Sequence, residues 1–165
     1  MSTRVGGMFL LEPKSSLEEK VLLSFILSEF ATEANIGLQQ GGNARFQNLS
    51  HPEDTGKDAI TFDITDDPLD INADCLFGGD GVAMYVGGER VDNGDSLAYR
   101  LLRLQNFFAK ALSNNKVLKI ILNVNFEREE EFNLVTIKVD EFQDEMIRLY
   151  EENSNWTPSL KIIIH

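Results

Sequence analysis

The chain has 165 residues, 42% of them hydrophobic, and a formal net charge of −12 at pH 7. This length and composition allow a core of ordinary size, so they exclude wholesale disorder and predict a single domain over residues 1–165. The negative charge repels nucleic acids and anionic membranes, and it favours basic proteins and cations as partners. The one cysteine, Cys75, can form no internal disulfide, and no apolar run is long enough to cross a bilayer, so we expect a cytoplasmic protein.

The first elements predicted are a short strand and a long helix. Residues 8–11 form an apolar run that favours a strand. Ser16, followed three residues later by Glu19, is typical of the capping box that begins a helix, here over about residues 16–34. Apolar side chains occur on almost every side of this helix, so we expect it to lie in the core, covered on more than one side.

The next region is rich in glycine and polar residues. Residues 35–58 predict a long loop with a short strand near residues 44–49. Residues 59–65 alternate apolar and polar side chains, which is typical of a half-buried strand. Apolar runs at residues 75–77 and 82–86 flank a GGDG sequence and predict a β-hairpin closed by a glycine turn. These glycines lack the spacing and the lysine of nucleotide-binding loops.

The clearest pattern covers residues 96–126, a helix followed by a strand. Asp95 or Ser96 can cap the helix, and its apolar face repeats at intervals of three and four residues. That face comprises Leu97, Leu101, Leu104, Phe108 and Ala111. Over residues 118–126 the apolar residues alternate instead, which predicts a strand.

The C-terminal part predicts a strand, a helix and a final strand. Residues 132–139 follow the preceding strand after a charged turn, so we expect these two strands to form an antiparallel hairpin. Asp140 caps a helix with an apolar face, and residues 160–164 form the last strand. In chain order the elements are β-α-β-β-β-α-β-β-α-β. This order predicts an α+β fold, a mostly antiparallel sheet with about three helices packed on it.

Aspartates are concentrated in residues 63–74. They are Asp63, Asp66, Asp67, Asp70 and Asp74. A solvated acidic turn is one interpretation, and a calcium or magnesium site is a second, although the spacing is not that of an EF-hand loop. A third is a contact surface whose carboxylates mimic the phosphates of a nucleic acid and bind a basic cleft. That surface would also include Asp80, Asp92 and Asp95.

Candidates for catalysis are few. The two histidines are His51, beside a proline in a polar segment, and His165, the last residue of the sequence. Cys75 lies in an apolar run, which is typical of a buried structural thiol rather than a nucleophile. We therefore expect a protein that is not an enzyme and that has no cofactor and no bound metal.

Basic residues are concentrated in residues 96–126, which contain five basic side chains and no acidic one. Arg100, Arg103 and Lys110 lie on roughly one face of the predicted helix. They either contact an anion or pair with acidic segments of the same chain at residues 53–95 and 127–152. Internal pairing is favoured, because a nucleic-acid contact would not be surrounded by so much negative charge.

In size and charge the chain resembles immunity proteins of bacterial toxin systems, which block a cognate nuclease toxin, and phage-encoded inhibitors that mimic DNA. This resemblance of type implies a basic protein partner, a toxin domain whose active or substrate-binding surface is covered. Two alternatives stay open. One is a metal-dependent enzyme that uses the carboxylates of residues 63–74, and the other is an assembly subunit that uses an exposed edge strand such as residues 160–164.

Overall fold

The computed structural model describes residues 5–13, 15–45, 58–65, 83–86, 89–92, 96–124, 132–152 and 159–165. Six strands of this part form one sheet in the order β2-β3-β1-β6-β8-β7. Their bounds are Val5–Leu11 (β1), Gly37–Arg45 (β2), Asp58–Thr65 (β3), Val117–Val124 (β6), Phe132–Ile137 (β7) and Ser159–Ile164 (β8). Two further strands, β4 (Ala83–Val86) and β5 (Glu89–Asp92), form an antiparallel pair of their own.

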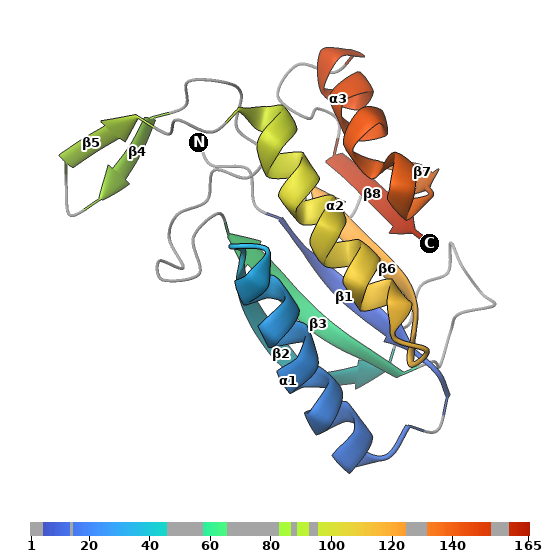
Figure 1. Cartoon of the computed structure of the whole chain (residues 1–165). Coiled ribbons are helices and arrows are strands. Elements are labelled where there is room, and N and C mark those ends of the chain that lie inside the picture. Colours follow the sequence, from blue (N-terminus) through green and yellow to red (C-terminus); the bar gives the residue numbers. More distant parts are fainter. Residues whose placement is uncertain are drawn as a thin grey trace.

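Three α-helices of the described residues pack on the six-stranded sheet (Figure 1). They are α1 (Leu17–Glu33), α2 (Leu97–Ser113) and α3 (Phe142–Glu152), and a 3-10 turn at Val139–Glu141 precedes α3. All sheet pairings are antiparallel except that of β7 with β8. The predicted α+β fold with a mostly antiparallel sheet is therefore confirmed. No helix of the described residues is both long and apolar enough to span a membrane.

The order of the last three strands corrects two predictions. β8 lies between β6 and β7, pairing antiparallel with β6 and parallel with β7. The expected hairpin of β6 with β7 is therefore wrong, and β8 is an interior strand rather than the exposed edge that an assembly subunit would use. The interior position suits β8 because this strand is apolar on both faces. Ile162 and Ile163 point to opposite faces of the sheet, and both side chains are buried.

Two strands of the N-terminal half also differ from expectation. The short strand expected near residues 44–49 is instead β2, which begins at Gly37 and ends at Arg45. Its sequence, GLQQGGNAR, is too polar to show the alternation of a strand. The strand β5, which pairs with β4, was not predicted, and residues 75–77, the other half of the expected hairpin, lie outside the described residues.

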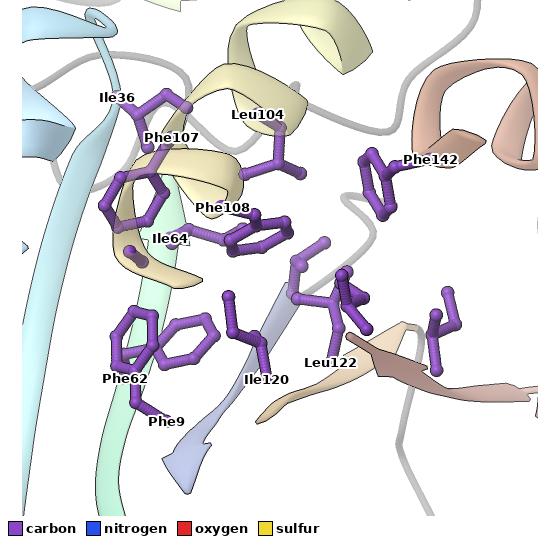
Figure 2. Packing of buried hydrophobic residues seen from close by; sticks show 14 of the residues in the cluster. Phe9, Ile36, Phe62, Ile64, Leu104, Phe107, Phe108, Ile120, Leu122 and Phe142 are labelled. Carbon is purple, nitrogen blue, oxygen red and sulfur yellow. The ribbon is translucent and has the colours of Figure 1, made fainter. Parts of the chain in front are cut away.

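The core lies between the helices and one face of the sheet (Figure 2). All five residues of the apolar face predicted for α2 are buried, which confirms that prediction. Phenylalanines from four elements, β1, β3, α2 and α3, meet there. The ring centroids of Phe9 and Phe62 are 4.4 Å apart, and those of Phe108 and Phe142 are 5.5 Å apart in a T-shaped arrangement. Truncating a buried phenylalanine of this kind typically costs about 3–5 kcal/mol, so this cluster fixes the helices on the sheet.

Helix α1 covers the β2 side of the sheet and also contacts α2, but its outer face is exposed (Figure 1). Its Leu23, Leu27 and Ala31 are buried, and Gln40 Nε2 on β2 donates to the Ser24 carbonyl oxygen at 2.6 Å. The expectation that α1 lies in the core is wrong for this outer face, which no other described element covers. Four large apolar side chains of α1 are exposed as a result. They are Leu17, Val21, Leu22 and Phe25.

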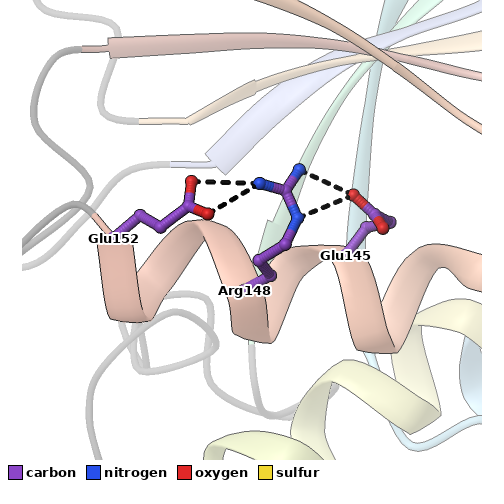
Figure 3. A network of polar contacts seen from close by, with 3 residues as sticks. All are labelled: Glu145, Arg148 and Glu152. Carbon is purple, nitrogen blue, oxygen red and sulfur yellow. Dashed lines mark hydrogen bonds and ion pairs between the residues drawn. The ribbon is translucent and has the colours of Figure 1, made fainter.

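The outer face of α3 is polar and carries a three-residue ion-pair network (Figure 3). Arg148 contacts Glu145 at 2.8 Å and Glu152 at 2.9 Å, one turn away on either side. The hydrogen bonds and charges of Glu145 and Glu152 raise the pKa of the Arg148 guanidinium above its usual value. The network keeps this face of α3 charged and in solvent, so α3 contributes only its opposite face to the core.

Candidate binding site on the sheet face opposite the helices

The pleat of the sheet separates two sets of side chains. Phe9 of β1 faces the helices, so Gly6 and Met8 face the other side. Gly6 pairs with Asp63 of β3 on one side and with Asn123 of β6 on the other. These three residues therefore form a row across three strands on the face opposite the helices.

A hollow of about 420 Å³ opens on this row. Its lining includes three glycines, Gly6, Gly7 and Gly41, and four side chains, those of Met8, Thr61, Asp63 and Asn123. Glycines inside strands mark places where the backbone is closely approached, and here they lower the floor of the hollow. A Cβ atom at Gly6 would lie 2.5 Å from Asp63 Oδ1, so the carboxylate of Asp63 extends over this glycine.

The β2 strand contributes Gly41 to the lining of the hollow. The pairing of β2 with β3 shifts register between Gln40 and Asn43, which is the mark of a β-bulge. Gly41 lies within this bulge, and a side chain there would overlap the hydroxyl oxygen of Thr61. The absence of a side chain at Gly41 thus leaves room beside the Thr61 hydroxyl, and both residues belong to the lining of the hollow.

Each of the three polar side chains around the hollow can accept a hydrogen bond. Asp63 supplies an exposed carboxylate, and Thr61 supplies a hydroxyl. The side-chain oxygen of Asn123 is buried and has no hydrogen-bond partner among the described groups. None of the described residues that line the hollow is basic. A ligand group rich in N–H donors and positively charged, an ammonium or a guanidinium, is the chemical complement of this lining.

Asp63 is the residue that connects the hollow with the acidic surface expected from the sequence. Of the other seven aspartates in that surface, Asp92 lies at the end of β5, in the separate hairpin. The remaining six, Asp66, Asp67, Asp70, Asp74, Asp80 and Asp95, lie outside the described residues. The described residues contain no group of three or more metal-ligating side chains.

Two of the three basic residues of α2 lie in the interior, and the third, Lys110, is exposed. Arg100 is fully buried and Arg103 is 7% exposed. Lys110 forms an ion pair with Glu33 of α1, which lies outside the two acidic segments expected to neutralise it. Lys110 is thus paired within the chain, but not with either acidic segment that the prediction named. Pairing of Arg100 and Arg103 with those segments stays a prediction.

Sequence reasoning missed Thr61, Asn123 and the three glycines. Asn123 and Thr61 each occupy a polar position of an alternating strand, which is the ordinary pattern for a solvent-facing residue. The usable signal was the glycine pair Gly6-Gly7 directly before the strand predicted at residues 8–11, since glycine within a strand indicates close approach of another group.

None of three comparisons gives a match. They cover models of protein families, curated proteins and solved structures.

Proposed function

We propose that this protein is an acidic, cytoplasmic binding protein that neutralises a basic protein partner. The partner class that fits best is a nuclease-type toxin domain, which an immunity protein blocks by covering its active or substrate-binding surface. The observation that carries the proposal is the hollow around Asp63, whose polar groups suit a cationic side chain. A net charge of −12 supports it, because a strongly acidic protein attracts a basic surface over a long range.

A lysine or arginine side chain of the partner enters the hollow in this proposal. Its charged group donates hydrogen bonds to the Asp63 carboxylate and the Thr61 hydroxyl, and rotation of the Asn123 amide offers a third acceptor. Arginine has the better geometry for a carboxylate, because its guanidinium can donate two parallel hydrogen bonds. Such charge-assisted bonds in a concave site contribute more than a pair on a flat surface, since water competes less there.

Neutralisation follows from the chemistry of the partner. A nuclease binds its substrate through basic side chains that contact phosphates. A protein that occupies one of those side chains and brings a large negative charge to the same surface competes with the nucleic acid directly. The aspartates beyond Asp63, from Asp66 to Asp95, would extend this contact in the proposal and accelerate association at low salt.

The test is capture of the partner with the purified protein as bait at low salt, followed by elution with increasing salt. Three baits are compared: the natural sequence, Asp63→Asn, and Glu151→Gln as a control that removes one exposed acid from α3. We expect a stoichiometric basic partner that salt releases, retention weakened about tenfold by Asp63→Asn, and retention unchanged by Glu151→Gln.

Inhibition provides the second measurement. The captured partner is assayed for nuclease activity with increasing amounts of each bait, and the natural protein is expected to inhibit at a one-to-one ratio. The proposal fails if the partner is acidic, or if Asp63→Asn inhibits as well as Glu151→Gln.

A further inference from the structure

The outer face of α1 is unusual for a helix that covers a sheet. Leu17, Leu22 and Phe25 are 61–68% exposed, and Val21 is 48% exposed. These side chains lie on one side of the helix, opposite Leu23 and Leu27, which face the core. Contiguous exposed apolar side chains of this size on a soluble protein usually mark an interaction surface.

Acidic residues close this apolar surface at both ends. Glu18, Leu22, Phe25 and Glu29 are spaced at i, i+4, i+7 and i+11, so they form one line along the helix. Leu22 and Phe25 occupy the middle of the line, and the two glutamates are about 16 Å apart along the helix axis. Both glutamates are exposed.

The other charged groups of α1 face the rest of the protein. Glu33 pairs with Lys110 of α2, and Glu19 pairs with Lys116 at 3.4 Å. Lys20, the one basic residue within α1, pairs with Asp58 of β3 at 3.1 Å. By contrast, Glu18 and Glu29 form no ion pair with a lysine or arginine of the described residues. The exposed face of α1 is therefore apolar in the middle and negative at both ends.

This charge pattern distinguishes the possible occupants. A second copy of the chain would bring the same acidic residues together, because the outer face of α1 offers no base to meet them. An anionic membrane would be repelled for the same reason. A helix with an apolar centre and a lysine or arginine near each end complements both features.

We propose that the outer face of α1 binds an amphipathic helix of a protein partner, with Leu22 and Phe25 packed against its apolar residues. Glu18 and Glu29 contact basic residues about three helical turns apart on that partner. Burial of the apolar residues supplies most of the affinity, and the two glutamates select the charge pattern and the register. This surface lies on the opposite side of the sheet from the hollow and does not depend on it (Figure 1).

The test uses two synthetic helical peptides and fluorescence anisotropy. Both peptides have leucines on one face, and one has lysine at each end of that face where the other has glutamate. The natural protein is expected to bind the lysine peptide at least about tenfold more tightly than the glutamate peptide. The double variant Leu22→Ser, Phe25→Ser is expected to lose that binding by at least about tenfold.

Two controls make the result specific. Leu134→Ser removes another exposed leucine, on β7, and is expected to leave peptide binding unchanged. Asp63→Asn is also expected to leave it unchanged, which separates this surface from the hollow. Circular dichroism checks that each variant is folded, and substitution of exposed residues should not unfold the protein.

Three results would overturn the inference. The first is equal binding of the lysine and glutamate peptides, and the second is binding that survives the double variant in a folded protein. The third is a concentration-dependent dimer, seen by sedimentation, that the double variant abolishes, because a second copy would then be the occupant of this face.

Discussion

Arg103 of α2 donates a hydrogen bond of 2.6 Å from Nη1 to the backbone carbonyl oxygen of Asn35, the second residue after the end of α1. The guanidinium also lies 5.6 Å from the centre of the Tyr99 ring. Carbonyl groups at the end of a helix have partial negative charge and lack partners within the helix, so a buried cation stabilises them. A basic residue that could have contacted an external anion instead connects two helices of the core.

Replacing this arginine should therefore lower stability more than binding. We expect Arg103→Met to reduce the free energy of unfolding by about 2 kcal/mol, because the Asn35 carbonyl oxygen loses a charged donor in a buried place. Urea unfolding measures the change, and Lys138→Met, at an exposed lysine, provides the control. A loss no greater than that of the control would show that the Arg103 contact contributes nothing to the fold.

Asn35 itself has a backbone conformation that few residues adopt. Its φ is 57°, the one positive value among the described residues other than glycine. The Ile36 amide donates to the Ala31 carbonyl oxygen and the Asn35 amide to that of Thr32, which together form a Schellman motif at the end of α1. We expect Asn35→Ala to lower the free energy of unfolding by about 1 kcal/mol and Asn35→Gly to leave it unchanged or slightly higher. Thermal unfolding of the pair tests this, and equal melting temperatures would contradict it.

The helices could be predicted because their signals are local. Ser16 and Ser96 each accept a hydrogen bond from the backbone amide three residues later, at 3.1 Å and 3.2 Å. A serine before a periodic apolar run is a reliable sign of this arrangement, since the sequence alone contains both the cap and the apolar face. For α2 the five predicted apolar positions are all buried, although Arg100, Arg103 and Phe107 are buried as well.

The order of the strands in the sheet could not be predicted from local sequence patterns. β8 is inserted between β6 and β7, although the chain visits β6 and β7 first, and that choice depends on burying both faces of β8. The exposed face of α1 was missed for a related reason, since a sequence shows that Leu22 and Phe25 are apolar but not whether another element covers them. The hollow depends on register, because Gly6, Asp63 and Asn123 come from three strands that are far apart in the chain.

Gly7 is the glycine for which substitution should be most harmful to the fold. A Cβ atom there would overlap the backbone carbonyl oxygen of Ile121 on the neighbouring strand, which cannot move without breaking the sheet. We expect Gly7→Ala to reduce the free energy of unfolding by about 3 kcal/mol. Gly41→Ala is the matched control, because its Cβ would meet the Thr61 side chain, which can rotate away. Chemical denaturation of both variants decides the point, and a smaller loss for Gly7→Ala than for Gly41→Ala would refute it.

Gly6 should separate binding from folding. A Cβ atom at this position would lie 2.5 Å from Asp63 Oδ1 and 2.9 Å from the Phe62 carbonyl oxygen, so the Asp63 carboxylate must turn away while the backbone shifts slightly. We expect Gly6→Ala to weaken retention of the basic partner about as much as Asp63→Asn does, because both remove the carboxylate from its place in the hollow. The loss of stability should be smaller than for Gly7→Ala, since the closest atom belongs to a side chain. Salt elution of the captured partner and urea unfolding of the same variant measure the two effects. If Gly6→Ala retains the partner as the natural protein does, the hollow is not where the partner's basic side chain binds.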